Sequence, residues 1–188
     1  VVLRIVLFLF PVFIYINTLN NGYALDDSIV ITENIYVKKG LSGIGEILST
    51  ETFTDFFKRK KELVEGGRYR PLSLVTFALE YELWGMKPGR SHLINALLYA
   101  ILCLVLFKTL RTILGFLNIE RKRDLIALLG TLIFIVHPVH TEVVANIKGR
   151  DELLAVLFLL LAINLILNYL RNGKYFQLPI AALLLLAG

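Results

Sequence analysis

The sequence predicts an all-α, polytopic transmembrane protein, and three observations support this fold class. Hydrophobic residues make up 56% of the 188 residues, and the mean hydropathy is +0.69, whereas an average soluble domain has about 45–50% apolar residues. The apolar residues are gathered into long runs that contain almost no charge. Most of these runs approach the length of about 20 residues that a helix needs to cross a bilayer.

The first transmembrane helix is expected at residues 3–20. Arg4 precedes this apolar run, as in a signal peptide, but no cleavage motif of small residues follows Tyr15, so we interpret the run as a membrane-spanning helix. Polar segments at residues 21–90 and 137–152 are expected to form two loops on one side of the membrane. The hydropathy pattern places the further helices at residues 92–117, 125–136, 152–170 and 178–188.

The two ends of the chain predict a fragment of a longer protein. The sequence begins with Val1 rather than Met, and the last apolar run, residues 178–188, is too short to cross a bilayer. No internal repeat or low-complexity linker is visible. We therefore interpret residues 1–188 as one partial transmembrane domain.

The distribution of Lys and Arg predicts the orientation of this domain and accounts for its net charge of +5. Basic residues of membrane proteins gather in short cytoplasmic loops, so the charge does not indicate a nucleic-acid partner. The basic cluster at residues 58–61 opposes the assignment, but long loops translocate largely regardless of charge. The loops 21–90 and 137–152 are thus expected outside the cytoplasm, at a bacterial inner membrane or in the endoplasmic reticulum. The basic residues that reach the cytoplasmic side together are Arg4, Lys108, Arg111, Arg121, Lys122, Arg123, Arg171 and Lys174.

The long first loop is expected to contain two helices that rest on the membrane surface. Residues 41–61 show apolar side chains at helical spacing with charged residues between them, which is typical of an interfacial amphipathic helix. A second helix is expected from Pro71, which suits a first helical turn, to Gly85. Near its end, Tyr81 and Trp84 fit the aromatic belt at headgroup level.

The third membrane helix is short, which predicts a cavity at the outer face. Its twelve residues, 125–136, span roughly 18 Å, whereas a bilayer core is about 30 Å thick. The His137-Pro138 pair ends the helix, since proline disfavours helical geometry at the preceding residue. Non-helical backbone at that depth must be buried in protein or line a water-filled cavity.

Two polar motifs are the candidates for chemistry, and an even number of membrane crossings between them places them on the same face. In the first, Asp26 and Asp27 are ionised at neutral pH and can act as a general base or bind a hard cation such as Mg²⁺ or Mn²⁺. In the second, His137, His140 and Glu142 are the candidates for metal ligands, while phosphate contact is equally compatible with this loop. The structural alternatives are a solvated turn with a helix cap for the first motif and a polar hairpin for the second.

The order and spacing of four sequence blocks resemble the GT-C superfamily of membrane glycosyltransferases. More narrowly, the chain is similar to the transmembrane and tetratricopeptide-repeat protein O-mannosyltransferases and their bacterial relatives. The resemblance covers residues 20–160, whereas the family's C-terminal repeats are absent from this sequence. The blocks are Tyr23 with Asp26 and Asp27; residues 68–72 with Thr76 and Phe77; Gly85, Pro88, His92 and Asn95; and residues 137–142 with Val144, Ala145, Gly149, Arg150 and residues 152–154.

The resemblance implies a GT-C-like fold and a glycosyltransferase activity. The expected reaction moves a sugar, with mannose as the expected identity, from a polyprenyl or dolichyl phosphate carrier to a Ser or Thr hydroxyl of an extracytoplasmic protein. In this family an acidic residue of the first outer loop serves as base, so the resemblance points to Asp27 or Asp26. The residues that it implies as contacts of the carrier phosphate are Arg70, His92, His137, His140 and Arg150.

A membrane transporter or channel with an outer-facing polar cavity is the alternative function, because intramembrane polar residues often line a solute path. A transporter predicts helices broken near the midplane and inverted repeats. The sequence shows neither feature, and its polar motifs gather at one face instead.

Overall fold

The computed structural model describes residues 2–49 and 70–188, and within these ranges the chain is helical and contains no strand. In this described part of the chain, three helical segments are long and apolar enough to cross a membrane, namely Val2–Asn20, Pro88–Phe116 and Ile147–Asn172. The predicted all-α, polytopic transmembrane fold is therefore confirmed.

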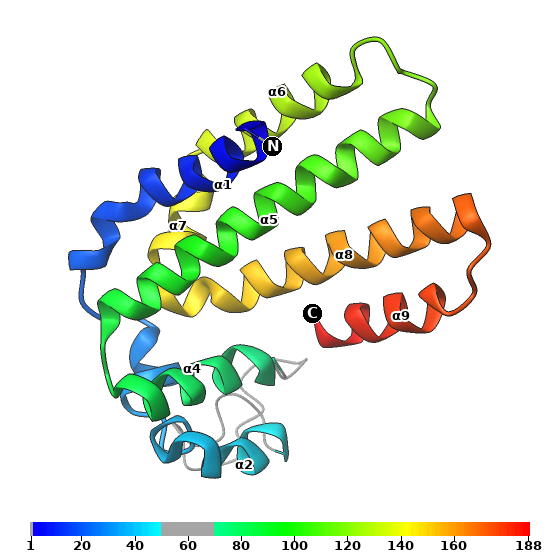
Figure 1. Ribbon diagram of the computed structural model, residues 1–188. Coiled ribbons are helices and arrows are strands. Elements are labelled where there is room, and N and C mark those ends of the chain that lie inside the picture. Colours follow the sequence, from blue (N-terminus) through cyan, green and yellow to red (C-terminus); the bar gives the residue numbers. More distant parts are fainter. Residues whose placement is uncertain (1, 50–69) are drawn as a thin grey trace.

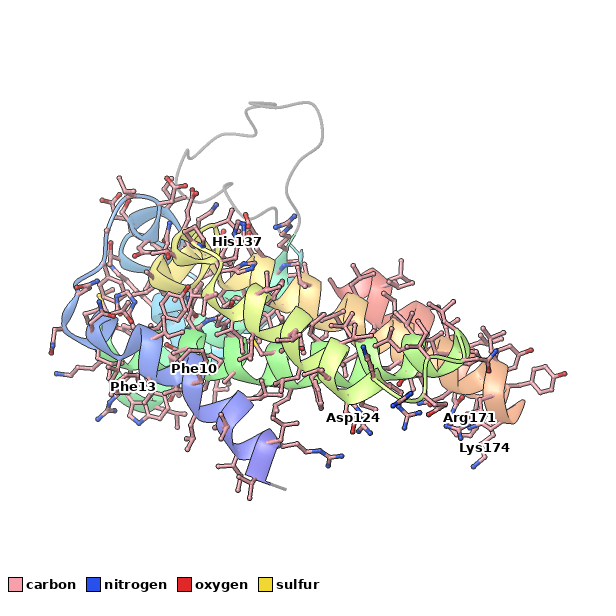
Figure 2. The ribbon with its side chains drawn as sticks, turned by 90° about the horizontal axis from the view of Figure 1, so that it is seen from above. Phe10, Phe13, Asp124, His137, Arg171 and Lys174 are labelled. Carbon is pink, nitrogen blue, oxygen red and sulfur yellow. The ribbon has the colours of Figure 1, made fainter. Side chains whose placement is uncertain are left out.

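The bundle is built around α5 (Pro88–Phe116), a helix of 29 residues that contacts most of the other membrane helices. As Figure 1 shows, α1 (Val2–Tyr15) and α6 (Arg123–Val136) lie along different parts of α5, and α8 (Arg150–Asn172) runs beside it. The last helix, α9 (Gln177–Ala187), turns back along α8. The outer side of α1 remains apolar and exposed, as at Phe13 in Figure 2, which suits contact with lipid.

A polar interaction inside the bundle ties α5 to α8. The Asn164 side-chain amide of α8 donates to the Thr109 hydroxyl of α5 and to the carbonyl of Leu160. Both polar side chains are at least 96% buried, with exposed fractions of 4% and 2%. Such bonds between membrane helices satisfy groups that lipid cannot solvate.

The first loop folds into a layer of short helices at one end of the bundle (Figure 1). These helices pack around buried apolar side chains that include Val37, Ile47 and Phe77. The predicted helix at 41–61 is described only to residue 49, and its remaining residues lie outside the described ranges. The interfacial position of both predicted helices stays a prediction. The elements of this layer are η2 (Ser28–Thr32, a π-helix), η3 (Val37–Gly43, a 3-10 helix), α2 (Ile44–Ser49) and α4 (Pro71–Trp84).

The second loop is more helical than the sequence indicates. After α6 ends at Val136, the chain forms α7 (His140–Ala145) and then η4 (Ile147–Gly149), a 3-10 turn that leads into α8. The end of α6 is stabilised from α5, because the Tyr99 hydroxyl lies 3.1 and 3.2 Å from the carbonyl oxygens of Phe134 and Ile135. This bond occupies carbonyls that a helix end leaves without partners.

A glycine allows the start of α5 to approach the end of the first membrane segment. A Cβ atom at Gly89 would lie 2.6 Å from the carbonyl oxygen of Leu19 in η1 (Ile16–Asn20). We therefore expect Gly89→Ala to lower the free energy of unfolding by about 1–3 kcal/mol, as overpacking does. Thermal unfolding in detergent measures this change. Gly45→Ala in α2 is the control, because open space surrounds that glycine; equal melting temperatures for the two variants would contradict the prediction.

Candidate active site

Asp27 joins the two polar loops directly. Its Oδ2 atom accepts a hydrogen bond from the backbone N–H of Ala24 at 2.9 Å, and its Oδ1 atom accepts one from the backbone N–H of Lys148 at 2.8 Å. The side chain is buried, with only 1% of the residue exposed. Although 121 positions separate Asp27 from Lys148, one carboxylate holds both loops at the same end of the bundle.

Asp26 has the opposite environment. Its side chain is 58% exposed, and its Oδ2 atom lies 3.8 Å from the Lys148 ammonium nitrogen. An exposed ion pair of this length contributes little to stability. The Asp26 carboxylate is therefore accessible to a substrate and already lies beside a cation.

Arg150 forms the polar centre of the region, where α4, α5 and α8 meet. None of its surface is exposed. Its Nε donates to Asn95 Oδ1 at 2.8 Å, and its Nη2 donates to the Ser91 carbonyl at 3.1 Å. Its Nη1 donates to the Thr76 hydroxyl at 2.9 Å and pairs with the Glu80 carboxylate. Arg150 therefore offers no accessible surface for the predicted contact with a carrier phosphate. Protein acceptors already engage all three of its side-chain nitrogens.

Asn95 and His92 lie on the same part of α5 and differ in their contacts. The fully buried Asn95 amide donates to the carbonyls of Asn146 and Ile147, which fixes the second loop against α5. His92 is 2% exposed, and within the described residues neither of its ring nitrogens makes a hydrogen bond of normal geometry. The backbone of Gly22 lies beside the His92 ring. Both ring nitrogens are shielded from solvent, so the imidazole packs against the first loop and has no open face for a ligand.

The two histidines of the second loop lie in an aromatic cluster. The His140 ring is 4.1 Å from that of Phe134 and 5.6 Å from that of Tyr99, while His137 lies 5.9 Å from His140. Burial, and next the nearby His137, lower the pKa of His140 below its ordinary value. His140 is therefore neutral at pH 7, where it can donate a hydrogen bond but carries no positive charge.

The predicted metal ligands do not form a group in the described part of the chain. Across residues 2–49 and 70–188, no three His, Cys, Asp or Glu side chains are arranged to hold a metal ion. Asp26 faces Lys148, and Glu142 is an exposed residue in the first turn of α7. A metal site built from Asp26, His137, His140 and Glu142 stays a prediction that would require these side chains to move.

Arg70 links the beginnings of two helices. It precedes α4 as its N-cap residue, and its Nη1 atom lies 3.2 Å from Asp151 Oδ2 in the first turn of α8. Its side chain is 38% exposed, so the guanidinium remains accessible. Arg70 is thus a partly exposed cation close to the helix that begins with Arg150.

Sequence reasoning missed Glu80, which gives Arg150 its counter-ion. The Glu80 Oε2 atom also accepts a hydrogen bond from the Ser91 hydroxyl at 2.5 Å. Burial raises the pKa of the Tyr23 phenol. A hydrogen bond with Ser91 lowers this pKa, whereas the negative charges of Glu80 and Asp27 raise it further, so the phenol stays protonated. The signal for Glu80 was its position on α4: Ser73, Phe77 and Glu80 share one helical face, so a carboxylate there faces the protein interior.

Loss of the Glu80 charge should destabilise the fold strongly, because Arg150 would remain as a buried, uncompensated cation. We expect Glu80→Gln to lower the free energy of unfolding by about 3–5 kcal/mol, the range for broken buried ion pairs. Asp124→Asn is the control, since Asp124 pairs with Arg111 at 2.7 Å but is 61% exposed, and exposed pairs contribute about 0–1 kcal/mol. Chemical denaturation of both variants measures the difference. A Glu80→Gln variant as stable as the control would show that the pair contributes little.

Comparison with known proteins identifies relatives that share most of this chain. Protein O-mannosyl-transferase TMTC3 of Homo sapiens is 33% identical over 159 residues, which is 84% of this chain and 16% of the relative. Protein O-mannosyl-transferase Tmtc1 of Drosophila melanogaster is 34% identical over 93% of this chain and 19% of the relative. Protein O-mannosyl-transferase TMTC1 of Homo sapiens is 36% identical over 84% of this chain and 17% of the relative.

These matches extend along most of the chain but cover less than a fifth of each of the three relatives. No protein-family model matches the sequence. No solved structure matches it significantly. With identities of 33–36% over 84–93% of its length, the chain is homologous to these protein O-mannosyl-transferases.

Proposed function

We propose that the protein transfers mannose from a polyprenyl or dolichyl phosphate carrier to a Ser or Thr hydroxyl of an extracytoplasmic protein. The observation that carries this proposal is the hydrogen bond from the Lys148 backbone N–H to Asp27, because it holds the two loops together and places the Lys148 ammonium beside Asp26. The names of the relatives support mannosyl transfer to a protein. The donor is a membrane lipid, and its phosphate reaches the site from the bilayer.

The reaction needs a base and a site for negative charge. The acceptor hydroxyl loses its proton to a carboxylate while its oxygen forms a bond to the anomeric carbon of the sugar. The bond between that carbon and the carrier phosphate breaks at the same time, and the phosphate leaves with the electron pair. Positive groups that face this phosphate stabilise the charge that develops on it. Displacement from the opposite side inverts the configuration of the anomeric carbon.

Asp26 is the better placed of the two carboxylates to act as base. Both oxygens of Asp27 already accept backbone hydrogen bonds, and the residue is buried. Asp26 is exposed beside Lys148, and its carboxylate can reach a hydroxyl from the water side. Asp27 therefore acts as a positioning residue, and Asp26 receives the proton.

The phosphate contacts are divided between charged and neutral groups. Arg70 is partly exposed and supplies positive charge. His137 and His140 supply hydrogen bonds from imidazole. The buried His92 reaches the phosphate only if the neighbouring backbone of Gly22 moves aside. Arg150 supports the site from behind, by fixing α4 and α5 against the start of α8. A divalent cation, Mg²⁺ or Mn²⁺, is an alternative partner for the same phosphate.

Substitution of the two aspartates separates their roles in the full-length protein. Asp26→Asn should lower mannose transfer to a Ser/Thr peptide by about 10²–10⁴-fold, the usual contribution of a general base, with an unchanged melting temperature. Asp27→Asn should lower stability by about 1–3 kcal/mol, because an amide places an N–H₂ group against a backbone donor. Transfer of radiolabelled mannose and thermal unfolding are measured on the same preparations.

Glu33→Gln is the matched control, because Glu33 is an exposed carboxylate in the same loop. It should retain full transfer. Wild-type transfer by both well-folded aspartate variants would overturn the proposed function. Loss of transfer only in a stable Asp27→Asn variant would instead assign the base to Asp27.

The extracytoplasmic side of the site is tested by cysteine labelling, since the native Cys103 is buried. A cysteine at exposed Glu33 should react with a membrane-impermeant maleimide on sealed right-side-out vesicles. A cysteine at Lys122, in the turn before α6, should react only after permeabilisation. The reverse labelling pattern would invert the proposed orientation.

A further inference from the structure

A basic pocket lies at the end of the bundle opposite the Asp27 site. Its volume is about 380 Å³, within the common size range for ligand sites. Figure 2 shows Asp124, Arg171 and Lys174 together at this end. The lining includes Lys108, Arg111, Arg123 and Arg171 with Asn168 and Glu120.

Three helices supply these side chains. Lys108 and Arg111 are three residues apart on α5, so they lie on the same face of that helix. Asn168 and Arg171 have the same spacing on α8, and Arg123 is the first residue of α6. The cations therefore converge on one space from separate elements.

The pocket has more positive charge than its carboxylates can pair. Arg111 is held by Asp124 through two bonds of 2.7 and 3.2 Å, and Arg123 lies 2.9 Å from Glu120. Lys108 and Arg171 have no ion pair with any described residue. Two cations thus remain available for an anion.

The surroundings of the pocket are apolar, which restricts the kind of anion. Phe116, itself a lining residue, is 45% exposed. Leu117 and Leu170 are 63% and 65% exposed at the adjoining ends of α5 and α8. A ligand with a negative headgroup and hydrocarbon chains can contact both the basic lining of the pocket and the exposed apolar side chains beside it.

We propose that this pocket binds the phosphate headgroup of an anionic membrane lipid. Basic pockets between membrane helices on the cytoplasmic side commonly bind such headgroups, and basic residues place this end in the cytoplasm. The phosphate lies between Lys108 and Arg171, Asn168 donates a hydrogen bond to it, and the acyl chains follow the exposed apolar residues. The site is separate from the proposed transfer site, because Asn95 and Lys108 lie 13 positions apart on α5, a rise of about 20 Å.

Native mass spectrometry of the detergent-solubilised, full-length protein tests this site. Wild-type protein should bind phosphatidylglycerol about tenfold or more tightly than phosphatidylcholine, because each nearby cation attracts anionic lipid. The double variant Lys108→Gln/Arg171→Gln should lose this preference. Lys108→Arg should retain it, since the charge is kept. The matched control is Arg121→Gln/Lys174→Gln, which removes two exposed cations that do not line the pocket and should bind like wild type.

Each contrary result is informative because the variants are checked for an unchanged melting temperature. Equal binding of both lipids by wild type would overturn the proposal. An equal loss in the Arg121→Gln/Lys174→Gln control would also overturn it, since the attraction would then be diffuse. Equally tight binding of water-soluble glycerol 3-phosphate would overturn the lipid as the ligand. Mannose transfer is measured separately, so failure of the transferase proposal does not affect this result.

Discussion

The Arg150 guanidinium is a charged group with no exposed surface, and the site region depends on how that charge is satisfied. Removing such a group from water costs several kcal/mol per ion. The cost is offset only because Glu80 supplies a counter-charge and because Thr76, Asn95 and the Ser91 carbonyl supply acceptors. The Phe77 ring covers the guanidinium, with its centroid 4.3 Å away. These partners belong to α4 and α5, so the ion holds both helices against the start of α8.

In this arrangement, different charged residues maintain the geometry of the region and offer surface to a ligand. Arg150 is fully engaged by protein and maintains geometry, whereas the more exposed Arg70 and Lys148 retain surface for a ligand. Asp27 and Asp26 divide their tasks similarly, since one is buried against backbone N–H groups and the other faces water. The more exposed residues, Arg70, Lys148 and Asp26, thus each lie near a buried charged residue, Arg150 or Asp27. Such support fixes the geometry of the exposed groups.

The sequence predicted the features that depend on local chemistry. Pro71 and Gly85 marked both ends of α4, and the His137-Pro138 pair marked the end of α6 at Val136. The pairing of Glu80 with Arg150 spans 70 positions and depends on how α4 crosses the bundle, which no local pattern encodes. The different burial of Asp26 and Asp27 depends on tertiary packing, since adjacent residues of one turn have the same local sequence signals. The helical turns of the second loop were missed because contacts from distant elements fix this loop, among them the Asn95 bonds to the carbonyls of Asn146 and Ile147.

The long sequence separation of the Asp27–Lys148 hydrogen bond has a consequence for biogenesis. The first loop emerges early in synthesis, yet the backbone N–H that completes the Asp27 environment is 121 residues further along the chain. Until that segment and α8 have been inserted, Asp27, Glu80 and Asn95 lack partners that they have in the folded protein. Contacts with such separation form late, after the cost of loop closure is met. The polar groups of the first loop therefore gain these partners only after the second loop and the start of α8 have been synthesised.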